Sequence, residues 1–285
     1  MKRRGSNDPI FGSHFTSVAA MRVGAPRVLF VLAFVCCVVA FDGCGKGLYQ
    51  VGDGELFGDI APGDYLLGMF NPTNNSLFSP VSSFGIDWEN DYIGYIRDDV
   101  GTALAAMIQA FEADNPSISL PVVSATRNYT KQEEIWTNKW FNVYENITQP
   151  IDRALAILQF SSKPGTSRHH WGTDVDLYAL ENYYFDFGDG KVIYSWLTEN
   201  AASFGFCQPY TDGRCAGYQE EKWHWSYQPL SSIFLRDWVL YYEFQLCRYM
   251  SKVHFPGSQE GASMLAPVYV QSINCQCKAP LHSYY

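Results

Sequence analysis

Two histidine-containing stretches, far apart along the chain, place the strongest constraint on how this sequence can fold. The first reads PGTSRHHWGTDVD over residues 164–176, and the second reads EEKWHWSY over residues 220–227. A catalytic zinc ion takes three protein ligands from imidazole and carboxylate groups and keeps one position open for water. His169, Asp176 and His224 would supply such a set. The fold must therefore bring the two stretches together if they act as one site.

A carboxylate next to this set would complete a hydrolytic centre. Zinc lowers the pKa of a bound water toward about 7, and a nearby glutamate can take the proton. Glu221 lies three residues before His224 and is well placed for this role. Either histidine alone would more often be a satisfied core residue. The two stretches together, with their spacing, favour a metal site.

The spacing of these residues resembles that of the zinc D-alanyl-D-alanine carboxypeptidases of the VanY-like peptidase group (the LAS or M15 group). That group shares its fold with D,D-dipeptidases, with phage L-alanyl-D-glutamate endopeptidases and with the hedgehog signalling domain. The resemblance implies an α+β fold, a small antiparallel sheet flanked by helices, which also suits the mixed short elements of this chain. The matching residues are Ser167, His169, Gly172 and Asp176 in the first motif and Glu221, Trp223, His224 and Tyr227 in the second.

A third motif extends the resemblance. The family carries Ser-x-x-Arg with a Gln five residues after the Arg, and here these are Ser124, Arg127 and Gln132. In the family this arginine binds substrate and steadies developing negative charge, which implies the same role for Arg127. A planar guanidinium can hold a carboxylate with two hydrogen bonds. Residues 64–70 resemble a lead-in found in one bacterial branch, so the resemblance runs from about residue 64 to about residue 245.

Neighbouring residues compete for two of the implied roles. Asp174 and Asp176 lie two positions apart and would share one face of a strand, and many family members have Ala at the first of these positions. The seven-residue spacing from His169 selects Asp176 as the ligand. The family spacing also selects Glu221 as the base, in preference to Glu220.

The resemblance further implies substrate contacts. Arg127, Ser167, Gln132 and Trp223 are the expected substrate-binding residues. Ser167 either hydrogen-bonds substrate or holds the turn, and Gln132 is expected near the start of a helix. Trp223 packs around the metal or lines the cleft. His170 matches no ligand position, so we expect it behind the ligands or on the surface.

These residues together imply a zinc-dependent D-alanyl-D-alanine carboxypeptidase acting on peptidoglycan stem peptides, with Glu221 and Arg127 as catalytic residues. One alternative is an endopeptidase of the same fold that cuts the L-Ala-D-Glu bond or a cross-link. Another is a non-catalytic zinc-containing binding module, against which the presence of both Glu221 and Arg127 argues. A net charge of −9, with no basic run beyond the N-terminus, argues against a nucleic-acid partner.

The N-terminus has the features of an export signal. Residues 28–41 are 14 consecutive apolar residues, preceded by basic residues and followed by a small-residue stretch. The run is short for a membrane span, which needs about 20 residues. We therefore expect an export signal over residues 1–44, starting at Met1 or Met21, with an uncleaved anchor as the alternative. Cys44 stands where a lipoprotein signal carries its lipidated cysteine, so we expect a cell-envelope or periplasmic location and membrane contact only through the signal or lipid.

Export implies an oxidising compartment in which disulfides form. Five cysteines follow the signal, so at least one is unpaired within the chain. Cys207 and Cys215 enclose a short polar loop and are predicted to pair. Cys275 and Cys277 could form a metal site with His282, but pairing of one of them with Cys247 is favoured.

Hydrophobic periodicity and turn residues divide the rest of the chain. We expect a linker and irregular N-terminal wrap over residues 45–95, a zinc peptidase domain over 96–250 and a loop-rich extension over 251–285. The periodicity predicts helices over 98–114, 131–145, 151–160, 192–204 and 233–250, short strands over 120–125 and 175–177, and a strand or turn over 223–227.

Overall fold

The computed structural model describes residues 56–278, apart from the side chain of Cys247. The export signal expected over residues 1–44, including Cys44, lies outside these residues, as does His282. Among residues 56–278, none of the helices combines the length and the apolar character needed to cross a membrane.

A four-stranded antiparallel sheet carries the residues of the two histidine stretches. Its strand order is β3-β4-β6-β5, so the strands from the two stretches, β4 and β6, are central neighbours. Alternation along β4 sends Asp174 and Asp176 to one face and Val175 and Leu177 to the other. The strands are β3 (Val122–Ser124), β4 (Asp174–Leu177), β5 (Phe206–Cys207) and β6 (His224–Tyr227).

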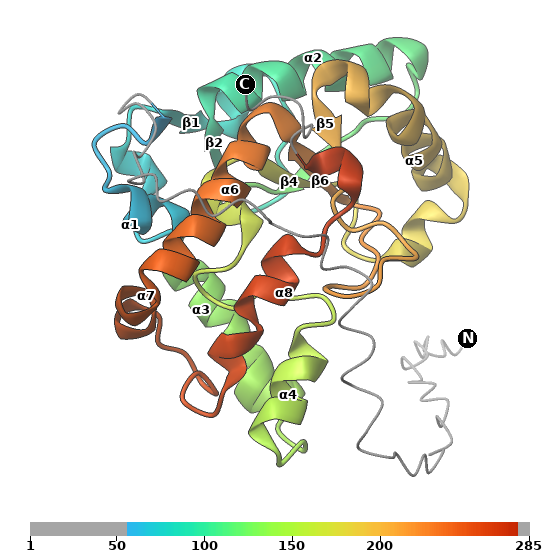
Figure 1. Ribbon diagram of the computed structural model, residues 1–285. Coiled ribbons are helices and arrows are strands. Elements are labelled where there is room, and N and C mark those ends of the chain that lie inside the picture. The colour runs from blue at the N-terminus through green and yellow to red at the C-terminus, as the bar shows by residue number, and fades with distance from the viewer. Residues whose placement is uncertain (1–55, 279–285) are drawn as a thin grey trace, which may run out of the picture. The chain divides into compact units, whose positions relative to one another are not determined.

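One hydrophobic cluster packs on the apolar face of this sheet. It joins Val175 and Leu177 of β4 with the buried stripe of α2 (Asp98–Asp114) and with α5 (Gly188–Asn200). The stripe on α2 recurs at helical spacing, as Val100, Leu104, Met107 and Phe111, which is why this segment forms an amphipathic helix. Figure 1 shows α2 along the top of the view and α5 at its right.

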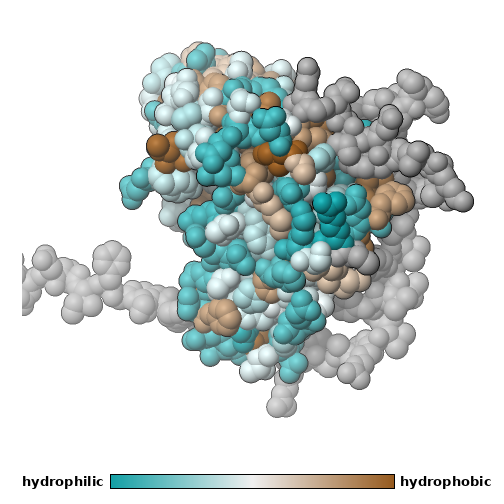
Figure 2. All heavy atoms as spheres, turned by 90° about the vertical axis from the view of Figure 1, so that its left-hand side faces the viewer, coloured by the Kyte–Doolittle hydropathy of each residue, from teal (hydrophilic) through white to brown (hydrophobic). Residues whose placement is uncertain are grey.

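A second hydrophobic cluster, rich in aromatic residues, joins the N- and C-terminal segments of the described chain. Among its fully buried members are Trp136, Trp171 and Trp238. In Figure 1 α3, α4 and α8 lie in the lower part of the view, while Figure 2 shows hydrophobic residues scattered among hydrophilic ones on the face it draws. The elements around this cluster are α1 (Pro62–Leu66), α3 (Tyr129–Asn138), α4 (Pro150–Ile157), α6 (Gln228–Phe244), α7 (Leu246–Lys252), α8 (Ala266–Gln271) and the hairpin of β1 (Phe78–Pro80) with β2 (Tyr95–Arg97).

The expected α+β arrangement, a small antiparallel sheet flanked by helices, is confirmed. The helix predicted over residues 98–114 has those bounds. The helix predicted over residues 233–250 is instead two helices, because Gln245 leaves the helical conformation with φ −128° and ψ 35°. The break lets Tyr249 of α7 pack back on Tyr242 of α6, with ring centroids 4.9 Å apart.

The predicted pairing of Cys207 with Cys215 is wrong. Cys207 forms a disulfide with Cys277, while Cys215 and Cys275 are free and exposed. Cys277 is therefore not available to Cys247 or to a metal site with His282.

The polypeptide around Cys207 explains the different pairing. Asn274 donates from its backbone N–H to the Pro209 carbonyl at 2.8 Å and from its side chain to the Gln208 carbonyl at 3.3 Å. These bonds lay the C-terminal segment along β5. Meanwhile the guanidinium of Arg214 donates to carbonyls that include Thr211 and Ser272. The loop is thus ordered by arginine rather than by a local disulfide.

Candidate metal centre and active site

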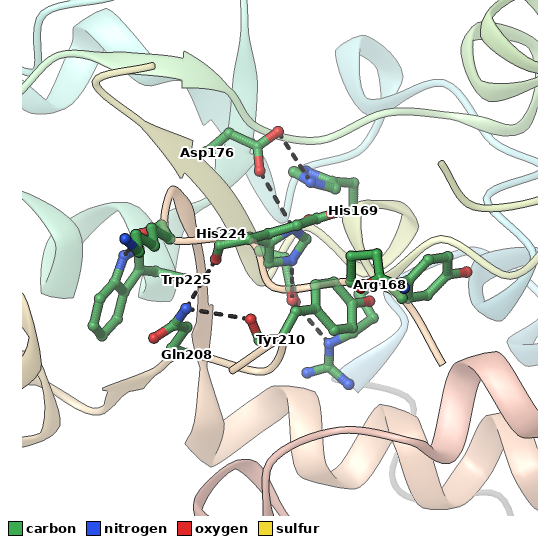
Figure 3. Close-up of polar contacts among 12 residues, drawn as sticks. Arg168, His169, Asp176, Gln208, Tyr210, His224 and Trp225 are labelled. Atoms are coloured by element: carbon green, nitrogen blue, oxygen red, sulfur yellow. Dashed lines mark hydrogen bonds and ion pairs between the residues drawn. The ribbon is translucent and has the colours of Figure 1, made fainter. Parts of the chain in front are cut away.

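Asp176 and His224 face each other across the two central strands of the sheet. They are directly opposite residues in the antiparallel β4–β6 pair, and opposite side chains on one face lie within contact distance. Oδ1 of Asp176 is 3.3 Å from Nδ1 of His224 (Figure 3). Strand register therefore sets this half of the site, and a slip of one residue would turn a side chain to the other face.

His169 reaches the same point from outside the sheet. It lies in the 3₁₀ helix Arg168–Trp171, just before β4. This helix ends at Gly172, whose φ is +73°, and a Cβ there would come within 2.4 Å of a neighbouring aromatic ring, so glycine is required. Nδ1 of His169 donates to the carbonyl of Ala125 at 2.8 Å. The other nitrogen, Nε2, is thereby directed to Asp176, 3.3 Å from Oδ2.

These three side chains fit a single small cation. His169, Asp176 and His224 are all buried, and each offers a ligand atom within 4.8 Å of the others. Two zinc ligands about 2.1 Å from the ion at a tetrahedral angle lie about 3.4 Å apart, close to the two 3.3 Å separations here. Within the described part of the chain, Nε2 of His169 and Oδ1 of Asp176 have no hydrogen-bond partner. A bound cation would satisfy both of these buried atoms.

The surrounding charges also suit a cation. Burial alone would raise the pKa of Asp176, but the two imidazoles hold that pKa well below its usual value. Burial alone would lower the pKa of His224, but the adjacent carboxylates of Asp174, Asp176 and Glu221 raise it well above its usual value. An imidazole that faces three carboxylates lies in an environment that attracts positive charge, which a divalent ion can supply.

Glu221 lies beside the ligand cluster, in the loop before β6. Its Oε2 is 3.2 Å from Nδ1 of His224. The backbone of Glu221 is fixed on both sides: its N–H donates to the Tyr210 carbonyl at 2.9 Å, and its carbonyl accepts from Nε2 of Gln208 at 3.0 Å. Burial raises the pKa of the Glu221 carboxyl. A raised pKa suits a carboxylate that accepts and returns a proton near neutral pH.

Arg127 lies just after β3, on the other side of Asp176. Its N–H donates to the His169 carbonyl at 3.1 Å, and its carbonyl accepts from Nδ1 of His170 at 2.6 Å. The side chain remains 21% exposed, and its Nη2 is 3.8 Å from Oδ2 of Asp176. Nε of Arg127 makes no hydrogen bond with any residue from 56 to 278. A partly open cation therefore lies next to the candidate metal position, where an anionic group can meet it.

The other predicted substrate-binding residues are buried. Ser167 Oγ and Gln132 Oε1 have no hydrogen-bond partner among the described residues. Gln132 of α3 donates from Nε2 to the Ser162 carbonyl at 2.8 Å and so braces the loop that leads to the first histidine. Trp223 is 7% exposed and packs against the exposed Phe160, with ring centroids 6.4 Å apart.

Two residues near the ligands in the sequence, His170 and Asp174, hold neighbouring groups of the site in place. His170 donates from Nδ1 to Arg127 and accepts at Nε2 from the N–H of Gly165 at 3.1 Å. Burial lowers its pKa to about 3, so this ring is a neutral brace inside the protein. Asp174 lies on the far side of the His224 ring, where its Oδ1 accepts from Nε2 at 3.0 Å.

Two further residues near the site have no signal in the sequence that pattern reasoning could use. The ring of Tyr210 packs against His224, with centroids 4.7 Å apart. Lys139 opens a five-residue π-helical turn at the end of α3 and donates from Nζ to Ser161 Oγ at 2.5 Å. Such turns often occur at functional sites, but helical periodicity does not reveal them.

Comparison with known families gives a match that spans all three motifs. Residues 94–230 match the VanY family model, described as D-alanyl-D-alanine carboxypeptidase. This range includes every residue of the site described above. A comparison with curated proteins finds no matching relative.

Several solved structures are similar to this chain. The LdcB LD-carboxypeptidase is 24% identical, with a TM-score of 0.36, over 46% of this chain and 65% of that one. A variant of the vancomycin resistance D,D-pentapeptidase VanY in complex with Zn(II) is 24% identical, with a TM-score of 0.41, over 55% and 88%. VanYB in complex with D-alanine-D-alanine is 25% identical, with a TM-score of 0.39, over 53% and 83%. The chain thus spans slightly less than two thirds of the LdcB protein.

Proposed function

We propose a particular reaction for the chain, starting from the match of residues 94–230 to the VanY family model, described as D-alanyl-D-alanine carboxypeptidase. The match supports the expectation of an enzyme. We propose that the substrate is a peptidoglycan stem peptide, that the bond cut is the one before the C-terminal D-alanine, and that the cofactor is zinc. His169, Asp176 and His224 would hold the ion.

The roles of the protein groups follow from their positions. Bound zinc would polarise the scissile carbonyl and lower the pKa of a water molecule. Glu221, whose carboxylate lies within 3.2 Å of the ligand nitrogen of His224, would accept a proton from that water and deliver it to the leaving amine. Its fixed backbone keeps the carboxylate at this position during both transfers.

Arg127 would bind the negative charge of the substrate. Its guanidinium is partly open and lies on the Asp176 side of the cluster. A C-terminal carboxylate, or the oxyanion that forms at the scissile carbon, can accept hydrogen bonds from it. We propose that Ser167 and Gln132, with their unpaired oxygens, and Trp223 complete the binding of the peptide.

One observation carries this proposal above the others. Buried ligand atoms of two imidazoles and one carboxylate converge within 4.8 Å, with a fourth group, the Glu221 carboxylate, beside them and unattached to any arginine or lysine by an ion pair in the described chain. A binding module needs the three ligands alone. A hydrolase also needs the free carboxylate.

The test is incubation of the purified protein with muropeptides of defined sequence, with and without a chelator, followed by mass analysis of the fragments. We expect loss of one D-alanine from a pentapeptide stem, prevented by the chelator and restored by zinc. Release of an L-alanyl-D-glutamate fragment, or separation of cross-linked dimers, would instead assign an endopeptidase. Intact muropeptides in every sample would contradict the proposal.

Export completes the proposal, because the substrate lies outside the cytoplasm. We propose that residues 1–44 direct the chain to the cell envelope and that Cys44 carries a lipid. Mass analysis of the N-terminal peptide of the exported protein tests this. A peptide that begins with a lipid-modified Cys44 is expected, and a peptide that retains residues 28–41 would indicate an uncleaved anchor.

A further inference from the structure

We infer that the buried ion pair of Arg168 and Asp174 positions His224 as a metal ligand, by fixing which ring nitrogen faces the cation. The inference rests on the proposed function, since it concerns the cation which that function requires. Nε2 of His224 meets Oδ1 of Asp174 at 3.0 Å. The opposite nitrogen, Nδ1, is the one that lies 3.3 Å from Asp176.

The chemistry of imidazole links these two contacts. A neutral imidazole carries one N–H and one lone pair, and an ionised carboxylate can only accept a hydrogen bond. Asp174 therefore keeps the proton of His224 on Nε2 and leaves the lone pair of Nδ1 directed at the metal position. A carboxylate behind a ligand histidine also makes the ligand more basic and fixes the plane of its ring.

The two histidines of the site have different supports. Nδ1 of His169 donates to a neutral carbonyl, that of Ala125, whereas Nε2 of His224 donates to a charged carboxylate. The support of His224 can be weakened by removing the charge of one side chain, Asp174. The support of His169 is a backbone carbonyl and cannot be weakened in this way.

Arg168 holds the supporting carboxylate in place. Its Nε donates to Oδ1 of Asp174 at 2.9 Å, and both side chains are fully buried. Thr173 donates from Oγ1 to Oδ2 of the same carboxylate at 2.6 Å. Nη2 of Arg168 donates to Oγ of Ser226 at 2.7 Å, which ties the arginine to β6. The oxygen of Asp174 that accepts from His224 is thus the one that Arg168 fixes.

Stability alone does not explain this pair. Removing two charges from water costs several kcal/mol for each ion, and replacing a buried pair by well-packed apolar residues is often neutral or stabilising. Here the pair also compensates charge at a crowded site, since Asp174 would otherwise add a third uncompensated carboxylate around His224. The structure therefore assigns the pair to the metal ligand.

The test compares metal binding in Asp174→Asn with that in the wild-type protein. Zinc affinity is measured by competition with a chromogenic chelator, and ligand geometry by the visible absorption spectrum of the cobalt(II)-loaded protein. We expect zinc binding to weaken by about 10–100-fold and the cobalt spectrum to change. The matched comparison is Ser226→Ala, which removes another bond of Arg168 and leaves both charges of the pair, and we expect it to weaken zinc binding by much less than Asp174→Asn does.

A second variant guards against misfolding, because Asp174→Asn leaves Arg168 buried without its carboxylate. Asp174→Asn combined with Arg168→Met removes both charges and is measured in the same way. Zinc affinity and a cobalt spectrum equal to wild type in both variants would overturn the inference and leave the pair a purely structural one. A wild-type protein that binds zinc but cleaves no muropeptide would contradict the proposed function, while a weaker zinc affinity in the variants would still support the role of the pair.

Discussion

Two positive side chains in the segment that leads to β4 are buried completely, yet their surroundings are opposite. Arg168 is 1% exposed and meets a carboxylate and a hydroxyl. Lys163 is 0% exposed, and its Nζ lacks a hydrogen-bond partner in the described chain. Its Nζ lies 5.2 Å from the centroid of the Tyr269 ring.

The difference shows two ways of burying a positive group. Arginine does not lose its proton in proteins, so Arg168 must be paired, and its partner belongs to the candidate metal centre. Lysine can become neutral, and burial lowers the pKa of Lys163 to about 7. The hydroxyl of Tyr218, whose ring packs on Tyr269 with centroids 5.0 Å apart, is also without a hydrogen-bond partner among residues 56–278. The Arg168 side chain is paired beside the candidate metal centre, while the unpaired Lys163 side chain lowers the stability of the fold.

Removing each of the two positive charges in turn tests this difference. The larger change in the free energy of unfolding is expected for Arg168→Met. The variant strands the buried Asp174 carboxylate, and loss of one partner of a buried pair typically costs about 3–5 kcal/mol. Urea unfolding of the metal-free protein, monitored by tryptophan fluorescence, measures the change in the free energy of unfolding. An Arg168→Met protein as stable as wild type would show that the pair is no better satisfied than Lys163.

The loss of the disulfide between Cys207 and Cys277 should disturb the surroundings of Lys163 more than those of Arg168. The disulfide connects β5 of the sheet to the C-terminal segment that carries Tyr269. Replacing both cysteines by alanine is expected to lower the free energy of unfolding by about 2–4 kcal/mol. Lys163 should then react faster with an amine-modifying reagent, while zinc affinity stays unchanged. A loss of zinc affinity together with faster modification of Lys163 would show that the two sites are not independent.

The smallest change is expected for Lys163→Met, and it has the opposite sign. Removing an unpaired buried polar group should raise the free energy of unfolding by about 1–3 kcal/mol at pH 7. The pH dependence follows from the pKa, which is about 7 in the folded protein against 10.5 for an ordinary lysine. Between these values the unfolded chain holds the proton and the folded chain does not.

Wild-type stability should therefore rise with pH across this window, by up to about 1.4 kcal/mol per pH unit. Below about pH 7 both states are protonated, and this group adds no slope. The control is the same urea titration on Lys163→Met, in which the rise should be absent. Parallel pH profiles for the two proteins would show that Lys163 remains charged when buried.

Local patterns in the sequence predicted the features that depend on a short run of residues or on a fixed spacing between motif residues. The apolar stripe of residues 98–114 determines a helix, and the result agrees. The spacing of His169, Asp176 and His224 predicted one cluster, and the structure brings these residues together. This works because β4 and β6 are short and pair in a register that puts the motif residues opposite each other.

Disulfide and ion-pair partners that the fold brings together from elsewhere in the chain could not be predicted. Cys207 pairs with a residue 70 positions away, because backbone hydrogen bonds bring the C-terminal segment to β5. Nothing in the sequence around Lys163 or Arg168 distinguishes the unpaired cation from the paired one, since the partner of Arg168 is fixed only when β4 forms. The break at Gln245 likewise accompanies a contact that helical periodicity does not reveal, the packing of Tyr249 on Tyr242.

The central claim is that a carboxylate beside a three-ligand zinc centre performs the proton transfer of a carboxypeptidase. The most direct measurement is D-alanine release from a stem pentapeptide by Glu221→Ala, with the zinc content of the same sample determined. We expect zinc to remain bound and the rate to fall by about two to four orders of magnitude, the usual contribution of a general base. A zinc-loaded Glu221→Ala protein that releases D-alanine at the wild-type rate would contradict the account.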